Sequence, residues 1–381
     1  MKVAFAHMFT LRTPRGIERY VINVANAVAR RGHDVTLITG RCPDSITRDW
    51  IDARVHVREI FHHNWHKLSF VPAFVHEFLT GGYDIVNIGI ARGEGYAAGL
   101  TCLLKEFRFN IIFHYPYENH EKHFNAFKRF STASKADEII GVSRYVTAGV
   151  TRCFGRAARV VPNGVDTDLF RPDPERRALI RKQLNIPGAA PVLLTVSALQ
   201  GRKGISKVLD ALSILKGRIP GVRYIVIGDG NAKDRNAFFE KVRSLGLESC
   251  VSFLGNQSDV APYYNAADLF VFLPEFEAFG IVTIEAMASG LPVVVSTGSA
   301  FPEILADGGG IMVDPDSSVQ VAETVLSLLN DRDRLTRTGE DGRKTVLRSY
   351  TWDAVALQLL SIFEKQLASA DPIGDGKRRG S

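Results

Sequence analysis

Short apolar runs of strand length alternate with helical stretches along almost the whole chain. In the first half, five such runs are predicted as strands, at residues 3–6, 35–39, 85–88, 111–113 and 138–142. Residues 17–31 are predicted as a helix, because their apolar side chains form one stripe: Ile17, Tyr20, Val21, Val24 and Val28. Strands separated by helices pair in parallel, since each connection has to cross the sheet. The alternation therefore predicts an α/β fold, with a parallel sheet covered by helices on both faces.

The second half repeats this architecture without repeating the sequence. Its strands are predicted at residues 192–196, 223–227, 250–253, 269–273 and 292–295. Helices are predicted between them, for example at 205–216 and 237–245. A chain of 381 residues is long enough for two domains of this kind.

A break in regular structure separates the two halves. The run Val161-Pro162-Asn163-Gly164-Val165-Asp166 is followed by Pro172 and Pro174, a pattern that is typical of an interdomain connector. Four segments are predicted: an N-terminal domain at 1–165, a C-terminal domain at 166–349, a helix at 350–370 and a disordered polar tail at 371–381.

Composition excludes several classes of protein. The four cysteines form no C-x-x-C pair, which fits reduced thiols better than a disulfide framework or a metal site. No apolar run approaches the roughly 18 residues that span a bilayer. The first residues are predicted to form a strand rather than a signal peptide. We therefore expect a cytoplasmic protein.

Charge is shared unevenly between the two halves. Residues 1–165 carry a formal charge of +8 and all ten histidines, whereas the remainder carries −2. A basic half favours an anionic partner, either phosphate groups or a membrane surface. A basic face that is only solvated explains the charge equally well.

The strongest indication of function lies in the stretch EAFGIVTIEAMASGLPVV, residues 277–294. It follows a predicted buried strand and carries Glu277 and Glu285 eight residues apart. Phe279-Gly280 marks the point at which a loop turns into a helix, where backbone N–H groups are free to bind phosphate or sugar hydroxyls. Glu277 then lies on the loop. Glu285, about one and a half turns into the helix, is predicted to point toward the same cleft.

This stretch resembles the E-x7-E motif of the retaining glycosyltransferases of family 4, which have the GT-B fold. Other motifs of that family follow along nearly the whole chain: P-N-G-V-D at 162–166 with Phe170, Lys203-Gly204, Gly228-Asp229-Gly230, Phe253-Leu254-Gly255 and Ala266-Ala267-Asp268. The resemblance implies two Rossmann-like domains that face each other across a cleft. The first binds the acceptor, the second binds the nucleotide sugar, and the C-terminal helix packs back on the first.

The resemblance also implies roles for individual residues. Negative charge develops on the diphosphate leaving group during sugar transfer, and fixed positive charge has to meet it. Lys203 is the candidate for this charge, and Gly16 lets the other domain's backbone approach the same phosphates. The other donor-binding candidates are the backbone N–H groups of Ile281 and Val282 for the diphosphate, Glu285 for the ribose, Glu277 with Ala278, Phe279 and Gly280 for the sugar, and Leu254 before the glutamate motif. His114, at a strand end, is expected near the sugar. We name Glu277, Lys203 and His114 as catalytic candidates.

In this family, retention of configuration is usually explained by attack on the same face, with the leaving phosphate taking the acceptor's proton. Glu277 is therefore not expected to be a covalent nucleophile. No metal and no other cofactor is expected. His62-His63-x-x-His66 and His120-x-x-His123 lack cysteine partners or a third ligand, so we interpret them as surface or acceptor-groove histidines.

Two positions depart from the family pattern. The first glycine of G-G-x-x-R is Arg15 here, and the arginine expected five residues before Lys203 is Ala198. Arg202 or Arg15 is expected to supply the missing charge, because a guanidinium suits phosphate geometry. If neither does, the protein is a slow enzyme or a nucleotide-sugar-binding relic. A UDP-sugar 2-epimerase of the same fold would need acid/base carboxylates in the first domain, which we do not find.

Two segments of the first half, 61–70 and 120–130, combine basic and aromatic residues. The second carries Phe124, Phe127 and Phe130 beside Lys122, Lys128 and Arg129. Such a segment is either a basic amphipathic helix on anionic lipid or part of the domain core, and no nucleic-acid-binding motif is present. We expect a hexosyltransferase of polysaccharide, lipopolysaccharide or glycolipid assembly, acting on a saccharide or lipid-linked acceptor. We expect it in the cytoplasm or peripherally on the inner face of the plasma membrane.

Overall fold

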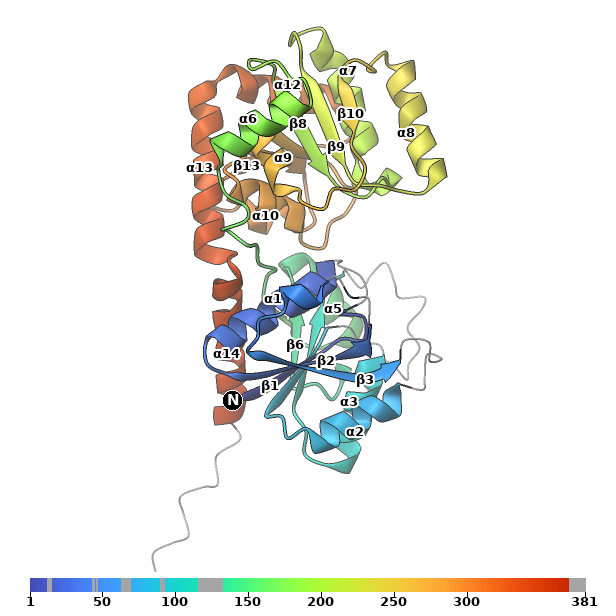
Figure 1. Cartoon of the computed structure of the whole chain (residues 1–381), viewed down its shortest axis with the longest axis vertical. Helices are drawn as coiled ribbons and strands as arrows, with labels where there is room; N and C mark the ends of the chain where they lie inside the picture. The colour runs from blue at the N-terminus through green and yellow to red at the C-terminus, as the bar shows by residue number, and fades with distance from the viewer. Residues whose placement is uncertain are drawn as a thin grey trace, which may run out of the picture. The chain divides into compact units, whose positions relative to one another are not determined.

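The structure is a computed structural model that describes residues 1–11, 16–42, 45, 47–62, 70–89, 93–115 and 133–369. The chain divides into two compact units (Figure 1). Unit 1 comprises Met1–Asn163 and Trp352–Ser381, and unit 2 comprises Gly164–Thr351. These divisions lie two residues from the predicted boundaries. They differ because Val165 N donates to the Tyr350 carbonyl over 2.8 Å, which ties the connector to the end of unit 2.

Unit 1 contains a seven-stranded sheet in the order β3-β2-β1-β4-β5-β6-β7, and all of its strand pairs are parallel. The strands are β1 (Lys2–Ala6), β2 (Asp34–Arg41), β3 (Val55–His62), β4 (Ile85–Ile88), β5 (Phe109–Phe113), β6 (Glu138–Gly141) and β7 (Arg159–Val160). The order reverses between β1 and β4, so their carboxyl ends lie at a topological switch point, the place where open α/β sheets bind ligands.

The helices of unit 1 are α1 (Gly16–Arg30), α2 (Val71–Thr80), α3 (Gly93–Leu104), α5 (Arg144–Phe154) and α14 (Trp352–Ala368). The predicted apolar stripe of α1 is buried, and it packs against α14, shown in red beside α1 in Figure 1. Val355, Leu359 and Phe363 of α14 are fully buried in this shared core. The last helix of the chain is therefore part of the first unit.

Unit 2 contains a six-stranded parallel sheet in the order β10-β9-β8-β11-β12-β13. Its strands are β8 (Val192–Val196), β9 (Arg223–Ile227), β10 (Val251–Phe253), β11 (Leu269–Phe272), β12 (Val293–Ser296) and β13 (Gly310–Val313). Its helices are α6 (Pro174–Gln183), α7 (Ile205–Lys216), α8 (Ala232–Ser244), α9 (Ala261–Ala266), α10 (Ile281–Ala288), α11 (Phe301–Ile304), α12 (Ser318–Asn330) and α13 (Arg332–Ser349).

Both units are therefore Rossmann-like, and the fold is the predicted GT-B arrangement of two α/β domains. The bounds of β8, β9 and α7 agree with the prediction, whereas α8 begins five residues earlier than predicted. Three strands were missed, namely β3, β7 and β13, and each is at the edge of its sheet. Edge strands are covered less completely than central ones, so they do not require a continuous apolar run. Among the described residues, no helix is both long enough and apolar enough to cross a membrane.

Candidate functional site

Most candidate residues of unit 2 lie in the loops that follow the carboxyl ends of its strands, while Ile281, Val282 and Glu285 lie in α10. Lys203 follows β8, Leu254 follows β10, and the loop with Glu277 joins β11 to α10. Parallel strands present these ends at one edge of the sheet, which brings together loops that are far apart in the sequence. The predicted donor-binding residues of this unit are therefore gathered at one edge.

Lys203 and Glu277 form an ion pair at this edge. The Lys203 Nζ donates to Glu277 Oε2 over 2.8 Å, and each side chain is 17% exposed. The ammonium group also lies 5.5 Å from the centroid of the Phe272 ring, at the end of β11. A partly buried ammonium group next to a carboxylate is held in position and still reaches solvent. The pair therefore presents one cation and one hydrogen-bond acceptor on the same surface.

The glycine after Lys203 fixes the position of this lysine. Gly204 has φ +76°, and a Cβ at this residue would lie 1.8 Å from the Leu273 carbonyl oxygen. Only glycine fits both the left-handed conformation and this close approach to β11. The 3-10 turn Gly201–Lys203 thus packs directly against the end of the strand that leads to Glu277.

The loop with Glu277 is positioned by the segment after β12. The backbone N–H of Glu277 donates to Ser299 Oγ over 3.1 Å, and Ser299 has φ +53°. Gly280, with φ +91°, is the N-cap of α10 and has no side-chain cap. The first N–H groups of a helix, here those of Ile281 and Val282, have no acceptor within the helix and attract anions. The sequence analysis did not identify Ser299. The only sequence feature that marks its position is the preceding Gly298.

Glu285 lies in α10, as predicted, but most of its surface is covered. The residue is 4% exposed, and its Oε2 accepts a hydrogen bond from Tyr264 Oη over 2.9 Å. Tyr264, on α9, was not singled out by the sequence. Its hydroxyl fixes the orientation of the carboxylate that is predicted to bind the ribose.

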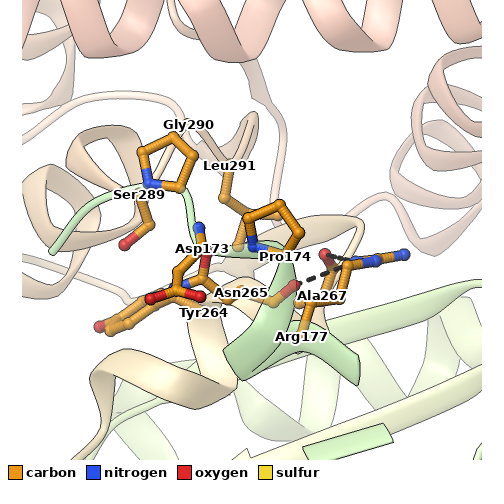
Figure 2. Close-up of a pocket in the computed structure, with 10 residues that line it drawn as sticks. Asp173, Pro174, Arg177, Tyr264, Asn265, Ala267, Ser289, Gly290 and Leu291 are labelled. Atoms are coloured by element: carbon orange, nitrogen blue, oxygen red, sulfur yellow. Dashed lines mark hydrogen bonds between the residues drawn. The ribbon is translucent and has the colours of Figure 1, made fainter. Parts of the chain in front are cut away.

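A hollow of about 240 Å³ on unit 2 lies apart from the Lys203–Glu277 pair. Figure 2 shows Tyr264, Ser289 and Leu291 around it, with Arg177 bonded to the Ala267 carbonyl. Ala267 precedes β11 and Leu291 precedes β12, so the hollow is at the amino ends of the strands. Lys203 and Glu277 lie at the opposite, carboxyl ends.

Ala198, one of the two positions that depart from the family pattern, lies on the loop after β8, as does Arg202. Ala198 is exposed, and Arg202 is half-buried with its guanidinium 5.1 Å from the centroid of the Phe276 ring. Arg202 is therefore close to the loop of Glu277. Its role as a replacement for the missing arginine stays a prediction, and Arg15 lies outside the described residues.

The G-x-G at the end of β9 packs against the loop after β8. A Cβ at Gly228 would lie 2.0 Å from the Ser197 carbonyl oxygen, and one at Gly230 would lie 2.3 Å from that of Leu199. These glycines allow two loops to pack closely. They face closely packed backbone rather than an open space.

In unit 1, His114 follows β5 and packs edge-on against Tyr20 of α1, with 4.7 Å between the ring centroids. Its Nε2 is fully buried and, among the described residues, has no hydrogen-bond partner. Burial, and to a smaller degree the nearby His7, lower the pKa of His114 to about 3. The ring is therefore a neutral imidazole at physiological pH. Gly16, exposed, begins α1.

The predicted acceptor segments are only partly described. Phe61 and Phe70 are buried and pack with Phe74, at centroid separations of 5.5 to 6.4 Å, so these aromatics belong to the core. Residues 63–69 and 116–132, which include the segment 120–130 and most of the noted histidines, lie outside the described residues. So does the predicted tail at 371–381.

Two family models together cover most of the chain. Residues 14–169 match Glycosyltransferase Family 4, and residues 176–345 match Glycosyl transferases group 1. The chain belongs to this glycosyltransferase family. The motifs quoted from the sequence fall within these two ranges, except that Phe170 lies between them.

Several curated glycosyltransferases are similar in sequence. A GDP-mannose-dependent alpha-(1-6)-phosphatidylinositol monomannoside mannosyltransferase of Mycobacterium tuberculosis is 35% identical over 240 residues, covering 58% of this chain and 60% of the relative. A D-inositol 3-phosphate glycosyltransferase of Corynebacterium glutamicum is 33% identical over 57% of this chain and 53% of the relative. The matched stretches thus span about half to three fifths of these relatives. A phosphatidyl-myo-inositol mannosyltransferase of Mycobacterium leprae is 26% identical over 98% of this chain and 99% of its own length.

Solved structures share the fold at lower identity. Sucrose-phosphate synthase from Thermosynechococcus elongatus superposes with a TM-score of 0.80 at 22% identity, covering 97% of this chain and 100% of that one. Anabaena HepE in complex with UDP gives a TM-score of 0.81 at 20% identity, over 96% and 100% of the two chains.

Proposed function

We propose that this protein transfers a hexosyl group from a nucleotide-diphosphate sugar, with retention of configuration, to a polyol or saccharide acceptor that carries a phosphate or a lipid. The observation that carries the proposal is the Lys203–Glu277 ion pair, which lies beside the N-terminus of α10 at the carboxyl edge of the sheet. A cation and free N–H groups suit the diphosphate, and a carboxylate suits the sugar hydroxyls. GDP-mannose is the donor we favour, because two of the relatives above are named as mannosyltransferases and one of them as GDP-mannose-dependent.

The leaving group makes the largest demand on the site. Breaking the glycosidic bond to phosphate concentrates negative charge on the diphosphate, and a fixed ammonium group stabilises that charge without rearrangement. In our proposal Lys203 leaves Glu277 for the diphosphate when the donor binds. Glu277 is then available to accept hydrogen bonds from the sugar.

Retention follows from the same assignment. The acceptor hydroxyl attacks from the face that the diphosphate leaves, and a phosphate oxygen takes its proton. His114, neutral at physiological pH, is suited to hydrogen-bond a sugar hydroxyl rather than to act as a cation. No metal takes part in this scheme, since Lys203 and the N–H dipoles provide the positive charge.

We further propose that the acceptor belongs to glycolipid or other cell-surface glycan assembly, including the polysaccharide and lipopolysaccharide classes. A basic first half with a charge of +8 supports an anionic acceptor, such as an inositol phosphate or a phospholipid headgroup. It equally supports a location in the cytoplasm, against the anionic inner face of the membrane.

The first experiment is a thermal-shift and donor-hydrolysis screen of the whole chain with GDP-, UDP-, ADP- and TDP-sugars in the presence of EDTA. We expect stabilisation by GDP-mannose and slow release of mannose. Lys203→Ala should remove both effects. The matched control Lys207→Ala changes a lysine one turn further on, which pairs with Asp316 over 2.7 Å, and it should behave like the native protein. No response of the native protein to any donor contradicts the proposal.

A second candidate function, donor binding without transfer, is favoured by one observation. Ala198 stands where the family has an arginine, and Arg202 is engaged with the Phe276 ring. A protein of this kind would be stabilised by the donor and yet release no sugar, so the same screen separates it from a transferase.

A further inference from the structure

The chain passes from one unit to the other twice, after Asn163 and after Thr351. Two aromatic residues flank the second of these crossings. Unit 2 ends at Thr351 and the second part of unit 1 begins at Trp352. Tyr350 precedes the crossing and Trp352 follows it. Neither residue belongs to the candidate site or to one of the family motifs.

Tyr350 supports the loop of Glu277 within unit 2. Its ring is edge-on to Phe279, with 5.7 Å between the centroids and an angle of 71°. Phe279 is 3% exposed and lies two residues after Glu277. The Tyr350 hydroxyl donates to the Glu303 carbonyl over 3.4 Å, so the ring is fixed at its far end.

The backbone of Tyr350 is fixed as well. Its N–H donates to the Val346 carbonyl of α13 over 2.9 Å, and its own carbonyl accepts from Val165 N over 2.8 Å. Val165 also forms a parallel bridge with Thr351. The two chain segments that lead to the crossings are therefore hydrogen-bonded to each other, which gives the Tyr350 ring a rigid base.

Trp352 supports the candidate histidine within unit 1. It is 9% exposed and lies edge-on to Tyr20, at 5.9 Å and 70°. Tyr20 is fully buried and packs in the same edge-on manner on His114. Among the described residues the Tyr20 hydroxyl has no hydrogen-bond partner, and the ring packs against both Trp352 and His114. Trp352 and His114 thus contact the same tyrosine.

We propose that Tyr350 and Trp352 are positioning residues for the transfer reaction. Tyr350 holds the sugar-binding loop through Phe279, and Trp352 holds the His114 imidazole through Tyr20. The catalytic role of the two residues rests on the proposed function. Their packing against Phe279 and Tyr20 can be tested in the protein without any ligand. Because one residue separates the two rings, one short piece of backbone supports a candidate element in each unit.

Tyr350 is tested by hydrogen exchange of the peptide that contains residues 277–285, in the whole chain without ligand. Tyr350→Ala should raise its exchange rate about tenfold or more, because the loop loses the ring that covers Phe279. Tyr350→Phe keeps the ring and should restore the native rate. The control Val242→Ala removes a buried side chain of α8, elsewhere in unit 2, and should leave the rate of this peptide unchanged. Equal exchange in Tyr350→Ala and native protein overturns the assignment.

Trp352 is tested by NMR of protein labelled at histidine ¹³Cε1, with the His114 signal assigned from His114→Gln. Trp352→Ala should shift or broaden this signal, because Tyr20 is no longer held against the imidazole ring. Trp352→Phe should return it close to the native position. Leu359→Ala, a fully buried change elsewhere on α14, is the control and should leave the signal in place. An unshifted signal in Trp352→Ala overturns the assignment.

Steady-state kinetics with GDP-mannose then test whether Tyr350 and Trp352 position groups that take part in the transfer reaction. Tyr350→Ala should raise KM for the donor about tenfold, and Trp352→Ala should lower kcat about tenfold at unchanged KM, since small misplacements of site groups cost about this much or more. Both phenylalanine variants should stay within about twofold of native protein. Native kinetics in both alanine variants would overturn the positioning roles. A native protein without turnover refutes the proposed function, while the exchange and NMR results still decide the structural assignment.

Discussion

The candidate residues of the two units are held in place in different ways. In unit 2, a lysine and a glutamate of opposite charge are bonded to each other at the edge of the sheet. In unit 1, His114 is neutral, and its ring packs edge-on against the Tyr20 ring. Charge that is already in place suits a diphosphate, whereas an uncharged, desolvated imidazole suits sugar hydroxyls. In our proposal the charged pair of unit 2 therefore stabilises the leaving group and binds the sugar, and unit 1 adds a neutral hydrogen-bonding group for the sugar.

The largest expected effect is the loss of Lys203. Lys203→Ala should lower kcat/KM for GDP-mannose by about a thousandfold, the upper range for removal of one group that stabilises developing charge. Steady-state release of GDP measures this. Lys207→Ala should stay within about twofold of native protein, because Lys207 pairs with Asp316 outside the site. A loss below tenfold in Lys203→Ala would place the leaving-group charge elsewhere.

The second prediction tests whether the ion pair is released on binding. Glu277→Gln should lower turnover about a hundredfold, because the sugar loses an acceptor of its hydroxyls. The same variant should bind GDP alone several-fold more tightly, since Lys203 no longer has to leave a carboxylate. Titration calorimetry with GDP decides the point. Glu323→Gln, which alters an exposed partner of Arg218, is the control. Weaker GDP binding in Glu277→Gln contradicts the exchange of partners.

The third prediction concerns the neutral histidine of unit 1. The pKa of His114 is about 3 in the folded protein and near 6.5 when unfolded, so the unfolded chain takes up a proton first as pH falls. The contribution to stability is complete above pH 6.5 and is lost progressively between pH 6.5 and 3. Between pH 7.5 and 5 the native protein should lose about 2 kcal/mol more stability than His114→Gln. Urea unfolding at the two pH values measures the difference, and identical losses would refute a buried neutral imidazole.

The smallest expected effect is a gain. Ala198→Arg restores a cation on the exposed part of the loop after β8 and should tighten binding of GDP-mannose about threefold to tenfold, because a guanidinium binds phosphate well. Arg202→Ala in the native background should weaken binding by a similar factor if Arg202 already supplies this charge. Titration calorimetry compares the two. Unchanged affinity in both variants would leave Lys203 as the cation that decides donor binding.

The sequence predicts the central strands and one edge strand, β10, but misses the other three edge strands. The runs at β8 and β9 are continuous and apolar because helices cover both faces. In β3, His56, Arg58 and Glu59 interrupt the apolar pattern, so the strand was not recognised. The motifs located Lys203 and Glu277 separately, whereas their pairing over 74 residues depends on how the strands are ordered in the sheet. Contacts such as Tyr264 with Glu285, and the left-handed backbone of Ser299, follow only from tertiary packing.

The packing of α14 on α1 has a consequence for synthesis on the ribosome. Unit 2 is one continuous piece of chain, residues 164–351, and it can fold as soon as it has emerged. Unit 1 is made first but lacks the face provided by Val355, Leu359 and Phe363 until residues 352–368 have been translated. The part of this core that α14 covers therefore lacks its partner while the whole of unit 2 is being made. The first domain in the sequence is the last to be completed.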